Sequence, residues 1–134
     1  MHPLFKKADA LTGAAIGAAM EVHSEKGPGL LESIYERCLM HELSLRKLTV
    51  INQRRVLISY KDIVFEETLR FDILVEDCLL IEGKCIERIT PVHKAQLISY
   101  MKLLNVPIGL LFNYHALSLK DDMHRLILPG ANAL

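Results

Sequence analysis

Apolar residues recur at helical spacing through the first third of the chain and predict two helices. The first is expected over residues 4–22 and the second over residues 30–47. Two glycines and a proline within residues 26–29 interrupt the pattern between them. The first helix carries a run of small residues, which permits close packing against another helix: Gly13, Ala14, Gly17 and Ala18.

The spacing then changes to an alternation of apolar and polar residues, which predicts strands. Strands are expected over residues 50–60 and 63–75, joined by a turn at Lys61 and Asp62, and over residues 78–86. Thr90 followed by Pro91 predicts the start of a helix that runs to about residue 104. The all-apolar run 107–112 predicts a buried strand, and residues 121–128 predict a turn and a final edge strand.

This element order, α-α-β-β-β-α-β, predicts an α/β (α+β) fold in a single domain over residues 1–134. A meander of three strands followed by a crossover helix and a further strand gives a mixed sheet flanked by helices. No run of about 18 uncharged apolar residues exists, so we expect no membrane-spanning segment.

The composition suggests self-association and limits the kind of partner. Hydrophobic residues make up 51% of the chain, and we therefore expect a homo-oligomer that buries part of this surface. Its candidate contacts are the small-residue helix face together with Leu103, Leu110, Leu111 and Phe112. Lys plus Arg equals Asp plus Glu at 16 each, which argues against tight non-specific nucleic-acid binding but leaves room for a local basic groove.

Three cysteines without CxxC spacing or a secretory signal indicate reduced thiols and a cytoplasmic location. The six histidines show no zinc-ligand spacing. His93 precedes Gln96 by about one helical turn, so its side chain can line the same surface.

The most informative residues are charges within strand-like apolar runs. Asp72 lies in one such run, and Glu82 and Lys84 lie in the next. Ionised groups on a half-buried sheet are costly unless they are paired or bind a metal. Glu82 and Lys84 share a face because they are two residues apart, and a hairpin through residues 76–77 places Asp72 beside them. Two carboxylates and an ammonium on one patch are the parts of a divalent-metal phosphodiesterase site.

The order of these motifs resembles the PD-(D/E)xK nuclease superfamily. Asp72 is followed by Glu82-Gly83-Lys84 and then by Gln96-x-x-x-Tyr100, an element similar to that of the RecB-like branch. Residues 29–35, Gly-Leu-Leu-Glu-Ser-Ile-Tyr, match the motif of the GxxExxY proteins, small bacterial and archaeal members of that superfamily. The resemblance covers nearly the whole chain and implies a restriction-endonuclease-like fold.

The resemblance also implies roles for individual residues. Asp72 and Glu82 would be metal-ligating carboxylates, with Glu32 as an additional acid ligand. Lys84 would be the catalytic lysine, and the helix-borne element of the site would be formed by Gln96 and Tyr100. The implied cofactor is Mg²⁺ or Mn²⁺, and the implied function is hydrolysis of phosphodiester bonds in nucleic acid, DNA in preference to RNA.

Each of these residues also has a simpler explanation. Glu32 in a first helical turn favours the helix dipole, and Glu82 with Lys84 can be an exposed pair. Asp72 can pair with Arg70 on the same face, while residues 96 and 100 can flank an apolar stripe. The alternative function is a catalytically silent nuclease-like module that acts by homo-oligomeric assembly or nucleic-acid binding.

One residue departs from the pattern of the superfamily. Gly83 stands between the glutamate and the lysine, where relatives usually carry a larger apolar residue. A glycine in a strand interior often marks a close approach, so we expect a neighbouring side chain to fill the space beside it.

Overall fold

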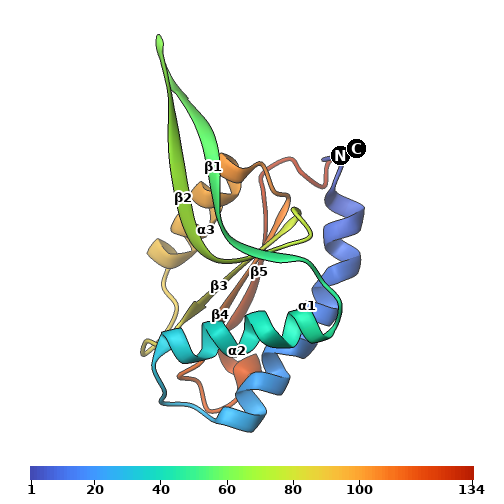
Figure 1. Ribbon diagram of the computed structural model, residues 1–134, viewed down its shortest axis with the longest axis vertical. Coiled ribbons are helices and arrows are strands. Elements are labelled where there is room, and N and C mark those ends of the chain that lie inside the picture. Colours follow the sequence, from blue (N-terminus) through green and yellow to red (C-terminus); the bar gives the residue numbers. More distant parts are fainter.

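The computed structural model describes residues 1–134, which form three helices and one five-stranded mixed sheet (Figure 1). The strand order is β1-β2-β3-β4-β5; β3 and β4 are parallel, and all other neighbours are antiparallel. The predicted element order and the final edge strand are confirmed. The elements are α1 (Phe5–Lys26), α2 (Glu32–Leu45), β1 (Val50–Tyr60), β2 (Ile63–Val75), β3 (Leu79–Lys84), α3 (Pro91–Leu104), β4 (Ile108–Asn113), a 3-10 helix (Leu119–Asp122) and β5 (Met123–Ile127).

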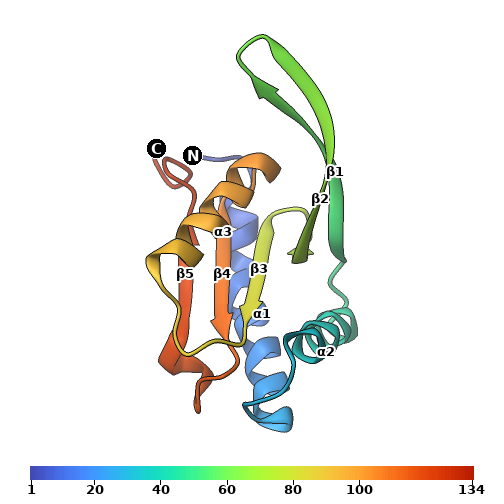
Figure 2. The ribbon, with the colours of Figure 1, turned by 90° about the vertical axis from the view of Figure 1, so that its left-hand side faces the viewer.

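The sheet lies between two helical layers, with α1 and α2 on one face and α3 on the other (Figure 2). Side chains alternate between the layers: Leu79 and Ile81 belong to the core under α1 and α2, whereas Leu80 belongs to the core under α3. By this alternation Glu82 and Lys84 face α3, and Gly83 faces the other layer.

The expected subunit contacts on β4 are wrong. Leu110, Leu111 and Phe112 are fully buried within the chain, because helices cover both faces of β4 and strands pair with both of its edges. Only Leu103 of the four large apolar candidates is exposed, on α3.

Of the small residues expected to form a packing face on α1, Ala18 is buried inside the chain and Gly17 is half-buried, whereas Gly13 and Ala14 are exposed. Ala15, Ala18 and Ala19 are fully buried in the core that α1 shares with α2. Arg46 crosses the exposed side, where its guanidinium donates to the carbonyl of Ala14 at 3.4 Å. A Cβ at Gly17 would lie 3.2 Å from that guanidinium.

None of the three α-helices combines the length and the apolar character that a membrane-spanning helix needs.

The helix start predicted at Thr90 is confirmed, and it is closed by a capping box. The backbone N–H of Thr90 donates to Nδ1 of His93 at 2.9 Å, and the Thr90 side chain caps the backbone of the same residue. The helix then lies close on β4, where a Cβ at Gly109 would come within 2.7 Å of the Met101 sulfur. This close contact fixes α3 over the face that carries Glu82 and Lys84.

The outer part of the β1–β2 hairpin projects from the body as a two-stranded arm (Figures 1 and 2). We call residues 55–68 the arm. Nearer the body, β2 pairs with β3 through only three residues, 73–75. Beyond residue 73 the two strands separate, and the candidate site lies where they part.

Candidate active site

The site begins at an irregularity in β2 centred on Asp72. Ile51 of β1 pairs with Leu74, but Gln53 pairs with Arg70, so three residues of β2 stand opposite a single residue of β1. Such a bulge bends the strand and re-aims its side chains. Here it turns β2 out of the sheet and directs residues 70, 71 and 72 toward one cleft.

The two carboxylates lie on facing strands and each binds the backbone of the other strand. The Asp72 N–H donates to Oε1 of Glu82 at 3.3 Å, and the Gly83 N–H donates to Oδ2 of Asp72 at 2.6 Å. The side chains therefore take over the hydrogen bonds that the separated strands no longer make, which holds both carboxylates side by side.

A cleft of about 430 Å³ opens at this point. Its walls come from α2, from the strands β2, β3 and β4, and from α3: Glu36, Arg70, Phe71, Asp72, Glu82, Lys84, His93, Gln96, Leu97, Tyr100 and Leu111. Five of the six residues singled out from the sequence thus line one cleft. The sixth, Glu32, does not line it but faces a small neighbouring cavity together with Asp72 and Tyr114.

Burial and mutual repulsion disfavour the charged forms of both carboxyl groups. Burial and then the charge of Asp72 raise the pKa of Glu82 to about 8. The pKa of Asp72 is raised to about 6, chiefly by burial and also by the charges of Glu36 and Glu32, while the Gly83 N–H and Lys84 oppose the shift. Without a bound cation the pair therefore retains a proton near neutral pH and carries only the remaining negative charge.

No ion pair compensates this charge. None of the five ion pairs in the structure includes Asp72, Glu82 or Lys84, and none joins Arg70 to Asp72. The two simpler explanations, an Asp72–Arg70 pair and an exposed Glu82–Lys84 pair, therefore do not describe the structure. Glu82 and Lys84 are half-buried in the cleft wall rather than on a solvated face.

The donor set fits a hard divalent cation. Each carboxylate uses one oxygen for a backbone N–H, which leaves Oδ1 of Asp72 and Oε2 of Glu82 without a protein partner. Mg²⁺ prefers oxygen ligands and is usually held by one or two carboxylates with water and substrate phosphate. No three His, Cys, Asp or Glu side chains are grouped to hold a metal together, so Glu32 does not complete a three-residue ligand set.

Gly83 is explained by Tyr114, which occupies the opposite face of β3. A Cβ at Gly83 would lie 2.5 Å from Cε2 of Tyr114. The Tyr114 ring stacks on Tyr35 with centroids 4.4 Å apart and an interplanar angle of 4°. Tyr35, the last residue of the 29–35 motif, donates its hydroxyl hydrogen to the Gly27 carbonyl. The expected neighbouring side chain is therefore present, and it links the motif to the strand of Glu82.

A hydrogen-bond network through Asn113 and Asp122 fixes the loop between Lys84 and α3. The amide of Asn113 donates to the Ile86 carbonyl at 2.9 Å and accepts from the Ile86 N–H at 3.3 Å. Asp122 accepts from the same amide at 3.0 Å and from the Ile89 N–H at 2.8 Å. Because Asn113 is buried, this network fixes the position of the loop, and with it α3, relative to β3.

Sequence reasoning missed two charged residues of the cleft. Glu36 lies one helical turn after Glu32, so the i, i+4 spacing of two acids was the available signal. Arg70 was assigned only as a partner of Asp72, yet its exposed side chain lies at the cleft. His93 lines the cleft as its spacing suggested, with Nδ1 engaged by the helix cap and Nε2 left free.

Comparison with known proteins gives one match. A family model described as the PD-(D/E)XK nuclease superfamily matches residues 9–126. The chain belongs to the PD-(D/E)XK nuclease superfamily. Asp72, Glu82 and Lys84 occur in the order that this name spells, on one face of the sheet. Neither the curated proteins nor the solved structures gave a match.

Proposed function

We propose that this protein is a divalent-metal-dependent nuclease that cleaves DNA in the cleft between β2, β3 and α3. The observation that carries the proposal is the pair of adjacent carboxylates, Asp72 and Glu82, facing the same cleft as Lys84. We further propose that it is one of the GxxExxY proteins, on the strength of residues 29–35. Three unpaired cysteines support a cytoplasmic location.

Asp72 and Glu82 would hold Mg²⁺ or Mn²⁺ through their free oxygens. A bound divalent ion lowers the pKa of a coordinated water and offsets charge on the phosphate. Glu36 and Glu32 add negative charge around the pair, as their effect on the pKa of Asp72 indicates, and this charge favours cation binding. Glu32 acts here from the neighbouring cavity rather than as a direct ligand in the cleft.

The remaining polar residues would bind and orient the substrate. The Lys84 ammonium has no ion-pair partner and faces the cleft beside Glu82, where it can hold the attacking water and neutralise a phosphate oxygen. Arg70, exposed at the cleft, is placed to meet the phosphate backbone. Gln96 and Tyr100 project from α3 one turn apart and offer an amide and a hydroxyl to the same substrate.

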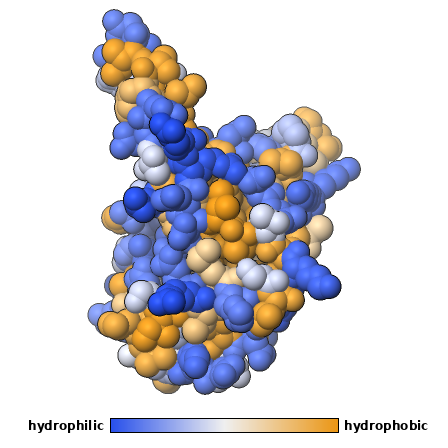
Figure 3. All heavy atoms as spheres, in the orientation of Figure 1, coloured by the Kyte–Doolittle hydropathy of each residue, from blue (hydrophilic) through white to orange (hydrophobic).

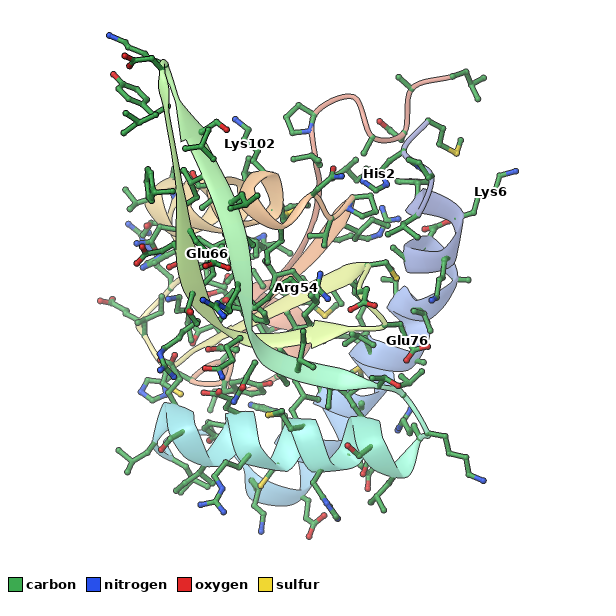
Figure 4. The ribbon with its side chains drawn as sticks, turned by 45° about the horizontal axis from the view of Figure 1, so that its top comes forward. His2, Lys6, Arg54, Glu66, Glu76 and Lys102 are labelled. Carbon is green, nitrogen blue, oxygen red and sulfur yellow. The ribbon has the colours of Figure 1, made fainter.

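The test is cleavage of labelled single-stranded, duplex and branched DNA, and of the matching RNAs, with Mg²⁺ or Mn²⁺. We expect cleavage of DNA by the wild type and its loss in Lys84→Ala, with metal affinity kept because an ammonium is no metal ligand. Lys102→Ala is the matched control, since Lys102 is exposed on α3 and does not line the cleft (Figure 4). Metal binding without cleavage of any substrate would instead support the catalytically silent module.

A further inference from the structure

The arm exposes more large apolar side chains than any other segment. Space-filling shows an apolar band just below its charged tip (Figure 3). Leu57 is 73% exposed, and four neighbours near the turn are also exposed: Tyr60, Ile63, Val64 and Phe65. An isolated two-stranded hairpin is marginal in water, so a surface of this kind is typical of a binding interface.

The arm also ends the sheet, because β1 has a paired strand on one side only. Its other edge presents unpaired backbone N–H and C=O groups along 11 residues. A long, exposed and apolar edge is a template for strand addition by another chain. The arm therefore offers both the backbone and the side chains of a strand-pairing surface.

The charges of the arm favour a protein partner over nucleic acid. Arg55 and Lys61 are outnumbered by Asp62, Glu66 and Glu67. Arg55 is already engaged across the hairpin with Glu66 at 2.9 Å. A nucleic-acid-binding arm needs a basic surplus to meet the phosphates, and this arm has an acidic one.

We propose that two copies of this chain pair edge to edge along β1, antiparallel about a two-fold axis that passes beside Leu57. A two-fold axis requires the same strand from each copy to run antiparallel to itself. In this register Leu57 faces its own copy, and Val56 faces Ile58 of the partner copy. Arg55 faces Ser59, so apolar residues meet apolar residues and no two like charges are opposed.

The sequence of β1 disfavours the neighbouring register toward the tip. A two-fold axis keeps both copies of each residue on the same face of the sheet, so the register can slip only by two residues, and the slip toward the tip places Arg55 opposite Lys61. Like charges directly opposite each other destabilise a strand pair. A register centred on Val56 avoids this repulsion but places Arg55 opposite Leu57 and separates Val56 from Ile58. Pairing about Leu57 is the register that both avoids this repulsion and places Val56 opposite Ile58.

The first experiment measures the mass of the full chain by light scattering at about 10–100 μM. We expect twice the chain mass of 15.2 kDa for the wild type and a monomer for Leu57→Lys. Leu117→Lys is the matched control, because Leu117 is 88% exposed but lies on the loop after β4. Far-UV circular dichroism spectra that match the wild type establish that the body of each variant remains folded, since both side chains are exposed; loss of the dimer by itself lowers the melting temperature.

The second experiment tests the register of the paired strands by oxidative cross-linking. In Leu57→Cys the two Cα atoms would lie about 4.5–5.5 Å apart across the axis, within the range of a disulfide. In Ser59→Cys, on the same face, the two copies would be four residues out of register, about 13 Å apart. We expect a covalent dimer from Leu57→Cys and none from Ser59→Cys or the wild type.

A wild-type monomer across this concentration range would overturn the proposal, as would cross-linking of Ser59→Cys in place of Leu57→Cys. Persistence of the dimer in Leu57→Lys, or its loss in Leu117→Lys, would also overturn it. If the wild type is monomeric and Leu57→Lys weakens binding to duplex DNA, the arm is a nucleic-acid surface instead. None of these measurements needs metal or cleavage, so the outcome is independent of the proposed nuclease activity.

Discussion

Replacing Gly83 with alanine tests how the strand of the candidate site is supported. The added Cβ would lie 2.5 Å from Cε2 and 3.3 Å from Cδ2 of Tyr114. The ring cannot simply move away, because Tyr114 is 1% exposed and stacks on Tyr35. Either β3 or the stacked pair must shift, and a shift of β3 displaces Glu82 and Lys84 on its other face.

The magnitude follows from two opposing effects. Overpacking a buried site by one methyl group costs about 1–3 kcal/mol. Removing a glycine from a strand interior returns roughly 0.5–1 kcal/mol through the unfolded chain. Because the 2.5 Å contact is with a buried, stacked ring, the upper part of the overpacking range, about 2–3 kcal/mol, applies here. We therefore expect Gly83→Ala to lower the free energy of unfolding by about 1–2.5 kcal/mol, which corresponds to roughly 4–9 °C in melting temperature for a domain of this size.

Urea unfolding followed by circular dichroism measures this change, with Gly13→Ala as the matched control. Gly13 lies within α1, where a Cβ would meet nothing within 4 Å. The same substitution there should raise stability by about 0.8–1 kcal/mol through helix propensity. The two variants should therefore shift in opposite directions. A Gly83→Ala protein as stable as the wild type would refute the packing argument.

Two further predictions concern buried polar groups. Because the pKa values of Asp72 and Glu82 are raised in the folded state to about 6 and about 8, the metal-free protein should be most stable below about pH 4 with respect to these groups. It should lose that stability as the pH rises from about 4, where the unfolded carboxyl groups titrate, to about 8. Urea titrations at about pH 4 and 9 measure this loss, which should be smaller in Glu82→Gln; an equal loss of unfolding free energy in the two proteins would contradict it. The Tyr114 hydroxyl is buried without a hydrogen-bond partner, so Tyr114→Phe should raise the free energy of unfolding by about 1 kcal/mol. A lower melting temperature in that variant would contradict this reading.

The periodicity of the chain predicts nearly all of the fold because each element has a clear apolar pattern and marked ends. Thr90 and Pro91 gave the start of α3, and the apolar run 107–112 gave the central strand β4. The same run could not also serve as a subunit contact, since a strand apolar on both faces is covered on both. Treating Leu110 and Phe112 as surface residues was therefore inconsistent with the strand prediction itself.

Long-range packing was less accessible from the sequence. Tyr114 fills the space beside Gly83 from 31 positions further along the chain, and no local pattern identifies it. Glu36 reaches the cleft only because β2 parts from β3 at Asp72, which depends on the bulge in β2. The alternation of β1 and β2 predicted a hairpin, but not that its outer half would extend beyond the body.

The most direct test of the central claim is calorimetric titration of Mg²⁺ or Mn²⁺ into wild type, Asp72→Ala and Asp62→Ala at pH 8. Asp62, at the turn of the arm, is the matched control because it is an exposed aspartate outside the cleft. We expect the wild type and Asp62→Ala to bind alike, with weaker binding at acid pH because the ligands must be ionised. Asp72→Ala should bind at least tenfold more weakly, about 1.4 kcal/mol. Equal affinity in wild type and Asp72→Ala would contradict the assignment of this carboxylate pair as the metal site.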